Sequence, residues 1–123
     1  MLQSLHVKNL ALIDEEEIDF TRGLNILTGE TGAGKSIILG ALSLAVGGKL
    51  EKDMVRDDTK DALVEAVFCI EDEATTEALK MRDVAVYDGE VILSRRIAGG
   101  RAQAKINGES VPAPKLAEIK PLL

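Results

Sequence analysis

The sequence predicts an α/β fold in which a mixed sheet with an antiparallel β-lobe is joined to one helix that follows a glycine-rich loop. Two observations lead to this prediction. The apolar run 24–28 (LNILT) is typical of a buried strand, and the loop after it leads into a helix over 35–46 with apolar residues every three to four positions. The segments 90–97 and 101–107 are typical of strands and are joined by Ala-Gly-Gly, which indicates an antiparallel hairpin.

The remaining elements follow from local patterns. The stretch 2–10 alternates loosely between apolar and polar residues, as a half-buried strand does, and 62–70 is a second apolar strand with Glu65 as its one charge. Acidic residues open the segment 71–82 and suit the N-terminus of a short helix. The segment 107–114 (NGESVPAP) is expected to be a turn, followed by a final short helix over 113–120.

Length and composition limit the class of protein. A chain of 123 residues, 46% of them hydrophobic and 29% charged, is expected to form one globular domain. No apolar run has the length of a membrane span and the start lacks a signal-peptide pattern, so we expect a cytoplasmic protein with no membrane partner. One His and one Cys exclude a metal site of the His/Cys kind, and Cys69 has no partner for an internal disulfide.

The segment 29–36 (GETGAGKS) fits the phosphate-binding pattern G-x-x-x-x-G-K-[ST] without a mismatch. Gly29, Gly32 and Gly34 allow the backbone to approach phosphates closely, and the amides from about residue 32 to residue 36 are expected to point at the anion. Lys35 would reach the β- and γ-phosphates, and the Ser36 hydroxyl would be a ligand of Mg²⁺. The cofactor-binding residues are therefore predicted as Gly29, Glu30, Thr31, Gly32, Ala33, Gly34, Lys35 and Ser36.

Nucleotide hydrolysis also requires a carboxylate that helps to hold the metal, usually Asp-Glu at the end of an apolar strand. Asp14 and Glu15 match those letters, but the few residues between Glu17 and Leu24 favour a tight antiparallel connection over the parallel crossover that this role needs. Glu71 and Asp72 also follow an apolar strand, yet they are better explained as a helix start. We therefore predict no catalytic residue within this chain.

The positive charge is concentrated in one segment, although the net charge of the chain is −6. Between Ser94 and Ile106 lie Arg95, Arg96, Arg101 and Lys105, and no acidic residue. Two interpretations stay open: a solvated strand face, or a patch that meets phosphates or an acidic partner. His6, within the first expected strand, is expected to be exposed.

The chain resembles the N-terminal part of the RecN family of bacterial DNA repair proteins, relatives of the SMC-type ATPases. The residues that carry this resemblance are LHVKNLALIDEEEIDFTRGLNILTGETGAGKSIILGALSLAVGGK, then DMVRDD, ALVEAVF and LSRRIAGGRAQAKINGESVP. It therefore covers nearly all of the chain. One departure is Gly40, where that family usually carries Asp, and we expect Gly40 to loosen the helix without affecting the phosphate site.

The resemblance implies that residues 1–123 form a single N-terminal half of an ABC/SMC-type P-loop ATPase head. The coiled coil and the C-terminal half-head, with the Walker B acids and the signature motif, would lie outside this chain. The implied partners are ATP with Mg²⁺, the C-terminal half-head, a second head in a homodimer, and DNA in the full-length protein on the nucleoid. The resemblance also implies that Lys8 and Asn9 contact the base or ribose, that Arg56 faces the nucleotide or the partner head, and that the segment 95–105 lies on the DNA-facing surface.

These considerations give a first reading and two alternatives. The first is a Mg-ATP-binding part of a repair ATPase that binds the nucleotide without turnover. The second is a non-catalytic interaction or dimerisation fragment that pairs through exposed sheet edges and apolar surface. The third is an independent small P-loop NTPase that uses Glu71 or Asp72.

Overall fold

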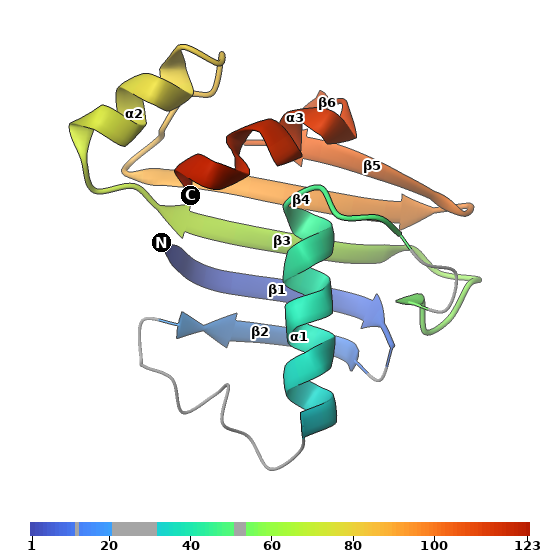
Figure 1. Ribbon diagram of the computed structural model, residues 1–123. Helices are drawn as coiled ribbons and strands as arrows, with labels where there is room; N and C mark the ends of the chain where they lie inside the picture. The colour runs from blue at the N-terminus through green and yellow to red at the C-terminus, as the bar shows by residue number, and fades with distance from the viewer. Residues whose placement is uncertain (12, 21–31, 51–53) are drawn as a thin grey trace.

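The computed structural model describes residues 1–11, 13–20, 32–50 and 54–123, and in it one antiparallel sheet carries helices across one of its faces (Figure 1). The sheet has six strands in the order β2-β1-β3-β4-β5-β6. The elements are β1 (Leu2–Leu10), β2 (Ile13–Asp19), α1 (Gly32–Ala45), β3 (Ala62–Cys69), α2 (Glu73–Lys80), β4 (Glu90–Ala98), β5 (Arg101–Ile106), β6 (Glu109–Val111), α3 (Ala113–Ile119) and the 3₁₀ helix η4 (Lys120–Leu122).

The strands form because apolar and polar residues alternate along them with a period of two. Along β3 the buried residues Ala62, Val64, Ala66 and Phe68 alternate with half-buried ones. In the antiparallel register Val64 lies opposite Arg95 and Ala66 lies opposite Leu93 of β4, so that the buried positions of the two strands share one face. This face is called the covered face below, and the opposite one the open face.

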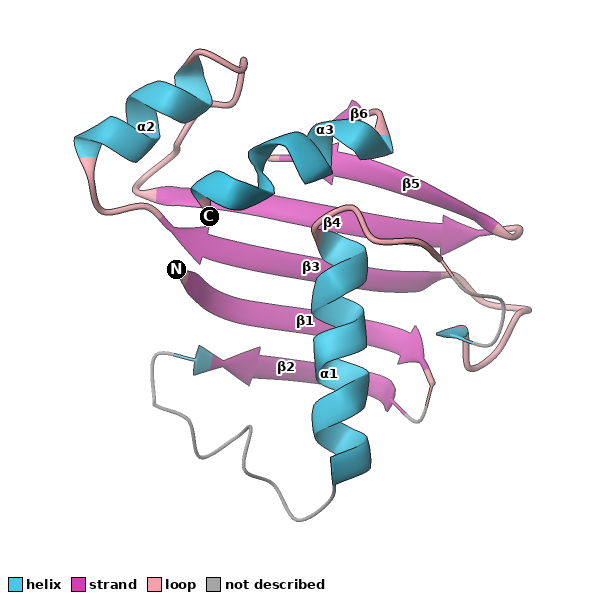
Figure 2. Ribbon diagram, in the orientation of Figure 1, coloured by secondary structure: helices cyan, strands magenta, loops and turns pink. Residues whose placement is uncertain are grey.

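Helix α1 crosses the strands on the covered face, and α3 with η4 lies on the same side (Figure 2). The C-terminal half of α1 is buried, at Ala41, Leu44 and Ala45, as are Leu116 and Ile119 of α3. The core thus lies between the covered face and these helices. Helix α2 lies off the end of β3 and β4 and contributes Leu79 to the same core cluster (Figure 1).

Most of the predicted elements are confirmed within the described residues. The strands expected over 2–10, 62–70, 90–97 and 101–107 are β1, β3, β4 and β5, and the last two form the expected antiparallel hairpin. The helix expected over 35–46 begins three residues earlier, at Gly32, and the one expected over 71–82 is α2. The strand predicted over 24–28 lies outside the described residues, whose strands all pair antiparallel, so the mixed character of the sheet stays a prediction.

One expectation was wrong: the segment 107–114 is more than a turn, because it contains β6. Asn107 and Gly108 both have positive φ, 52° and 85°, and form a two-residue connection after which Glu109 pairs with Ile106. Asn-Gly is the dipeptide best suited to such a tight hairpin, because both residues tolerate the left-handed region. The sequence therefore held the signal for a second hairpin.

The two ends of the chain lie next to each other (Figure 1). The terminal ammonium group of Met1 donates to the carbonyl oxygens of Cys69 at 3.0 Å and of Leu123 at 3.3 Å. Among the described residues, no helix has the length and apolar character that a membrane crossing requires.

Candidate functional site

Helix α1 begins inside the phosphate-binding motif. Its first residue is Gly32, so the backbone of residues 32–36 lies at the N-terminal end of a 14-residue helix. The first amides of a helix lack partners within the helix and carry the positive end of its dipole, which makes them donors to an anion. Gly29, Glu30 and Thr31, and the side chains of residues 32–37, lie outside what the structure describes.

The donor set of this motif fits a magnesium nucleotide. Backbone amides and the Lys35 ammonium are groups that bind phosphate oxygens, and the Ser36 hydroxyl is an oxygen ligand of the kind that Mg²⁺ prefers. The first turn of α1 contains no acidic residue that would repel a phosphate. A metal site elsewhere is not indicated, since no group of three or more His, Cys, Asp or Glu suited to a metal occurs in the described part of the chain.

Asn9, which the resemblance placed at the base or ribose, is engaged within the protein. Its side chain is buried, and its Nδ2 donates to the carbonyl oxygens of Asp57 (2.8 Å), Lys60 (3.1 Å) and Asp61 (3.4 Å). Its Oδ1 accepts from the backbone amide of Asp57 at 2.9 Å. Both polar ends of the side-chain amide therefore bind the connector between α1 and β3, and the nucleotide contact of Asn9 stays a prediction.

Lys8 and Arg56, the other two positions that the resemblance singled out, are both exposed. Lys8 lies opposite Glu15 of β2 in the register. The backbone amide of Arg56 donates to the carbonyl oxygen of Asn9 at 3.1 Å, so the structure brings Asn9 and Arg56 together at the end of β1. Arg56 keeps its assignment as a prediction.

Asp14 and Glu15 lie on the hairpin formed by β1 and β2, and the connection to Leu24 on which their interpretation depended lies partly outside the described residues. β2 pairs antiparallel with β1, and both carboxylates are exposed. Glu15 Oε2 lies 3.2 Å from Nε2 of His6, whose side chain is one-third exposed. These acids therefore occupy a solvated edge strand, as expected.

Asp72 caps helix α2, as expected of an acid at a helix start. Its carboxylate accepts from the backbone amide of Thr75 at 2.9 Å and from the Thr75 hydroxyl at 2.6 Å. These two hydrogen bonds, the hydroxyl's first and the amide's second, lower the pKa of Asp72 below its ordinary value. Both neighbours, Glu71 and Glu73, are exposed. The geometry is that of an N-cap.

The basic segment is divided between the two faces of the sheet. Arg96 lies opposite Gln103 on the open face, and the period of two places Arg101 and Lys105 on that face beside Gln103. Arg96 Nη1 lies 3.3 Å from Asp61 Oδ2. Arg95 lies on the covered face and is buried, so its assignment to an exposed DNA-binding patch was wrong. The alternation in 90–97 could have revealed this, since Arg95 is spaced by even numbers of residues from the apolar positions Val91, Leu93 and Ile97 and therefore lies on their face of the strand.

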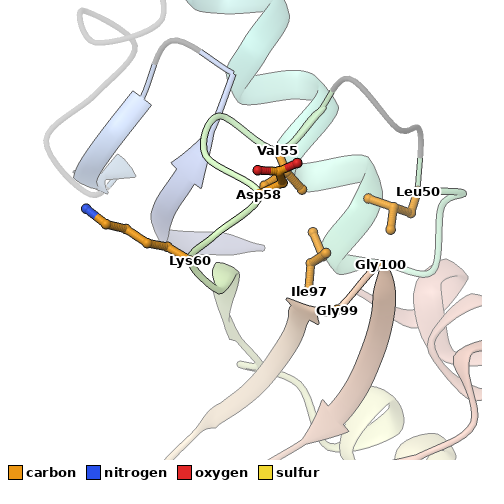
Figure 3. A pocket seen from close by; sticks show the side chains of 7 residues that line it. All are labelled: Leu50, Val55, Asp58, Lys60, Ile97, Gly99 and Gly100. Atoms are coloured by element: carbon orange, nitrogen blue, oxygen red, sulfur yellow. The ribbon is translucent and has the colours of Figure 1, made fainter.

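A pocket of about 340 Å³ opens between the connector and the turn of the β4–β5 hairpin (Figure 3). Leu50, Val55 and Ile97 gather around it, with Asp58, Lys60 and Gly99-Gly100 along its border. Leu50 follows the C-terminal end of α1, whose 14 residues span about 20 Å. The pocket is therefore lined by the segment that follows the C-terminal end of α1, by residues on either side of Arg56 in the connector, and by the turn of the β4–β5 hairpin.

A known family covers most of the sheet and all of α1: residues 4–111 match the family described as an AAA domain. The chain belongs to the AAA domain family. It is also 39% identical over 125 residues to the DNA repair protein RecN of Bacillus subtilis, covering all of this chain and 22% of that protein. The corresponding protein of Vibrio cholerae is 35% identical over 125 residues, again with all of this chain and 22% of the relative covered.

Solved structures with the same fold are heads of SMC ATPases. One, from work on ATP-driven dimerisation and DNA-stimulated activation of SMC ATPases, matches with a TM-score of 0.72 and 22% identity, over 98% of this chain and 78% of that one. A second is an SMC head bound to the C-terminal winged-helix domain of ScpA, with a TM-score of 0.69, 21% identity, and 98% and 40% of the two chains covered. The family member described here thus has the fold of part of an SMC head and matches the N-terminal region of RecN proteins. It spans about a fifth of the length of the RecN proteins that it matches.

Proposed function

We propose that this chain is the Mg-ATP-binding N-terminal half-head of a RecN-like DNA repair ATPase. The observation that carries the proposal is the intact motif 29–36 at the start of α1, in a chain with the fold of an SMC ATPase head. In this role the amides of residues 32–36 cradle the phosphates, Lys35 neutralises the β- and γ-phosphates, and Ser36 holds Mg²⁺.

We propose that turnover requires groups from outside this chain. This proposal is supported by the exposure of Asp14 and Glu15 on β2 and by the role of Asp72 as the N-cap of α2. The Walker B acids and the signature motif are therefore proposed to come from a C-terminal half-head and from a second head in a homodimer. DNA is the proposed further partner of the complete protein, which would act in the cytoplasm on the nucleoid.

The proposal is tested with Lys35→Ala beside Lys49→Ala as a matched control. Both variants remove one lysine charge, but Lys49 is exposed and follows the other end of α1. Titration of each protein with a fluorescent ATP analogue and Mg²⁺ is expected to give binding by the wild type and by Lys49→Ala, and none by Lys35→Ala. Equal affinity in the wild type and both variants would contradict the assignment of the site.

A second candidate function, an interaction fragment, is favoured by an apolar surface on the outer side of α1. Leu39 is 51% exposed there, beside a groove of about 300 Å³ to which Leu42, Val46, Phe68 and Leu123 contribute. The sheet edges are a weaker basis for association, because β2 carries five acidic residues in seven and β6 has three residues in all.

Sedimentation velocity separates the two functions. A dimer in the wild type that becomes a monomer in Leu39→Ser would support association through α1. A wild-type monomer that binds Mg-ATP would disfavour the interaction fragment.

A further inference from the structure

Arg95 is the one charged side chain that is buried among the residues whose burial the structure describes, with 5% of its surface exposed. It lies near the middle of β4 on the covered face, opposite Val64 of β3 and Ala104 of β5. Its neighbours along the strand on that face, Leu93 and Ile97, are apolar. A guanidinium at this position therefore needs an explanation that packing alone does not provide.

The guanidinium holds the C-terminal end of α1. Arg95 Nη1 donates to the carbonyl oxygen of Leu44, one residue before the end of the helix, and to that of Gly48 just beyond it, each at 3.2 Å. The Leu44 carbonyl also accepts from the backbone amide of Gly47 at 3.2 Å, so Arg95 supplies a second donor at the end of the helix. Helix α1 has no basic residue in its own last turn, so the cation that faces the negative end of its dipole comes from the sheet.

Burial of this charge is costly. Its Nε has no hydrogen-bond partner in the described structure, and no carboxylate among the described residues forms an ion pair with it. Burial lowers the pKa of the Arg95 guanidinium, although an arginine remains protonated in a protein. The two carbonyl contacts and the helix dipole are the described groups that offset this cost.

Helix α3 packs against the turn that follows the same end of α1. Gly47 has a φ of 101°, and a Cβ added there would lie 2.9 Å from the backbone nitrogen of Ala117. The C-terminal end of α1 thus contacts Arg95 of β4, and the turn after it contacts α3. A helix of 14 residues is rigid and about 20 Å long. Contacts that hold one end therefore constrain the position of the other end, which contains residues 32–36 of the phosphate-binding motif.

We infer that Arg95 is a positioning residue for the phosphate-binding site: it anchors the C-terminal end of α1 to the sheet and thereby sets the position of the motif at the N-terminal end. This inference rests on the proposed function, since it concerns the affinity of that same site for Mg-ATP. It assigns to Arg95 a role that involves no contact with the nucleotide.

The test compares four substitutions in the 123-residue chain. Arg95→Met keeps much of the side-chain volume and removes both donors and charge, Arg95→Gln keeps a neutral donor, and Arg95→Lys keeps a charged one. Arg96→Met is the matched control, because Arg96 is the next residue of β4 but is exposed on the open face. Mg-ATP affinity is measured by titration at a temperature at which circular dichroism reports each variant as fully folded, and thermal unfolding is recorded in parallel.

Arg95→Met is expected to weaken Mg-ATP binding at least about tenfold, since small displacements of binding groups are costly. Arg95→Lys should restore most of the affinity, and Arg96→Met should match the wild type. A role in stability alone would lower the melting temperature of Arg95→Met and leave the affinity of the folded protein unchanged, and that result would overturn the inference. If Arg95→Met does not fold, Arg95→Gln decides by the same criterion. Absence of binding by the wild type would instead overturn the proposed function, and the inference with it.

Discussion

Asn9 and Asp57 hold each other through a pair of hydrogen bonds: Asn9 Nδ2 donates to the Asp57 carbonyl oxygen at 2.8 Å, and the Asp57 amide donates to Asn9 Oδ1 at 2.9 Å. Asn9 also has a φ of 57°, which Asn adopts more readily than most residues. The last residues of β1 and the connector that leads from α1 to β3 are therefore joined by one amide side chain.

Asn9→Ala is expected to lower the free energy of unfolding by about 2 kcal/mol, because it leaves part-buried backbone groups of the connector without partners. Asn9→Asp, which keeps the shape and the acceptor but loses the donors, is expected to be destabilised as well. Urea denaturation measures both. A fully stable Asn9→Ala protein with impaired Mg-ATP binding would instead favour a nucleotide contact.

Two glycines near the ends of the buried half of α1 should respond to alanine in opposite directions. A Cβ at Gly40 would have no atom within 4 Å apart from the neighbouring residues and the backbone of its own helix, so Gly40→Ala is expected to stabilise the protein by about 0.5 to 1 kcal/mol through helix propensity. Gly47→Ala should destabilise it, because of the positive φ and the 2.9 Å approach to Ala117. Thermal unfolding of the two variants is the measurement, and stabilisation by Gly47→Ala would contradict the packing of α1 against α3.

The cap of α2 should make a pH-dependent contribution to stability. Hydrogen bonds from Thr75 hold the pKa of Asp72 below its ordinary value of 3.8, so this contribution is present above that value and is lost as the pH falls through the lowered pKa. Asp72→Asn retains a capping side chain that does not titrate. The stability difference between wild type and Asp72→Asn, measured by denaturation from pH 6 to pH 2.5, is therefore expected to shift against the wild type on acidification.

The same variant addresses the remaining alternative. An independent NTPase that used Asp72 would lose turnover in Asp72→Asn, whereas a cap leaves Mg-ATP binding unchanged.

The open face should contribute to any DNA binding through Arg96, Arg101 and Lys105. Replacing all three with Gln is expected to weaken binding of duplex DNA and to reduce the slope of log affinity against log salt by about 2 to 3, at about 0.9 per phosphate contact. The matched control replaces the exposed residues Lys49, Lys80 and Lys120 with Gln, which changes the net charge equally. Equal loss in both triple variants would indicate an effect of net charge with no contribution from the face.

Patterns of apolar and polar residues over a few positions were sufficient to predict most of the strands and helices. The alternation along 62–69 and 90–97 was sufficient for β3 and β4, and the acids at residues 71–73 were sufficient for the start of α2. β6 was missed because its three residues are too short for a period of two to be recognised, and only the Asn107-Gly108 turn indicated it.

The roles of Asn9 and Arg95 could not be predicted in the same way, because both depend on distant backbone. Asn9 bonds to residues 48 to 52 positions away, and Arg95 bonds to carbonyls 51 and 47 positions away. Sequence spacing carries no information on such contacts until the fold is known. The alternation of residues along β4 predicts that Arg95 lies on the covered face, but it does not predict the contact with the end of α1.

We propose above all that this chain binds Mg-ATP and does not hydrolyse it alone. The most direct test measures, in one sample of the purified chain with Mg²⁺, the equilibrium binding of ATP and the release of phosphate, beside Lys35→Ala. We expect saturable binding that Lys35→Ala abolishes, with no phosphate release above background. Phosphate release that disappears in Lys35→Ala would contradict it, because a catalytic carboxylate would then have to lie within these 123 residues.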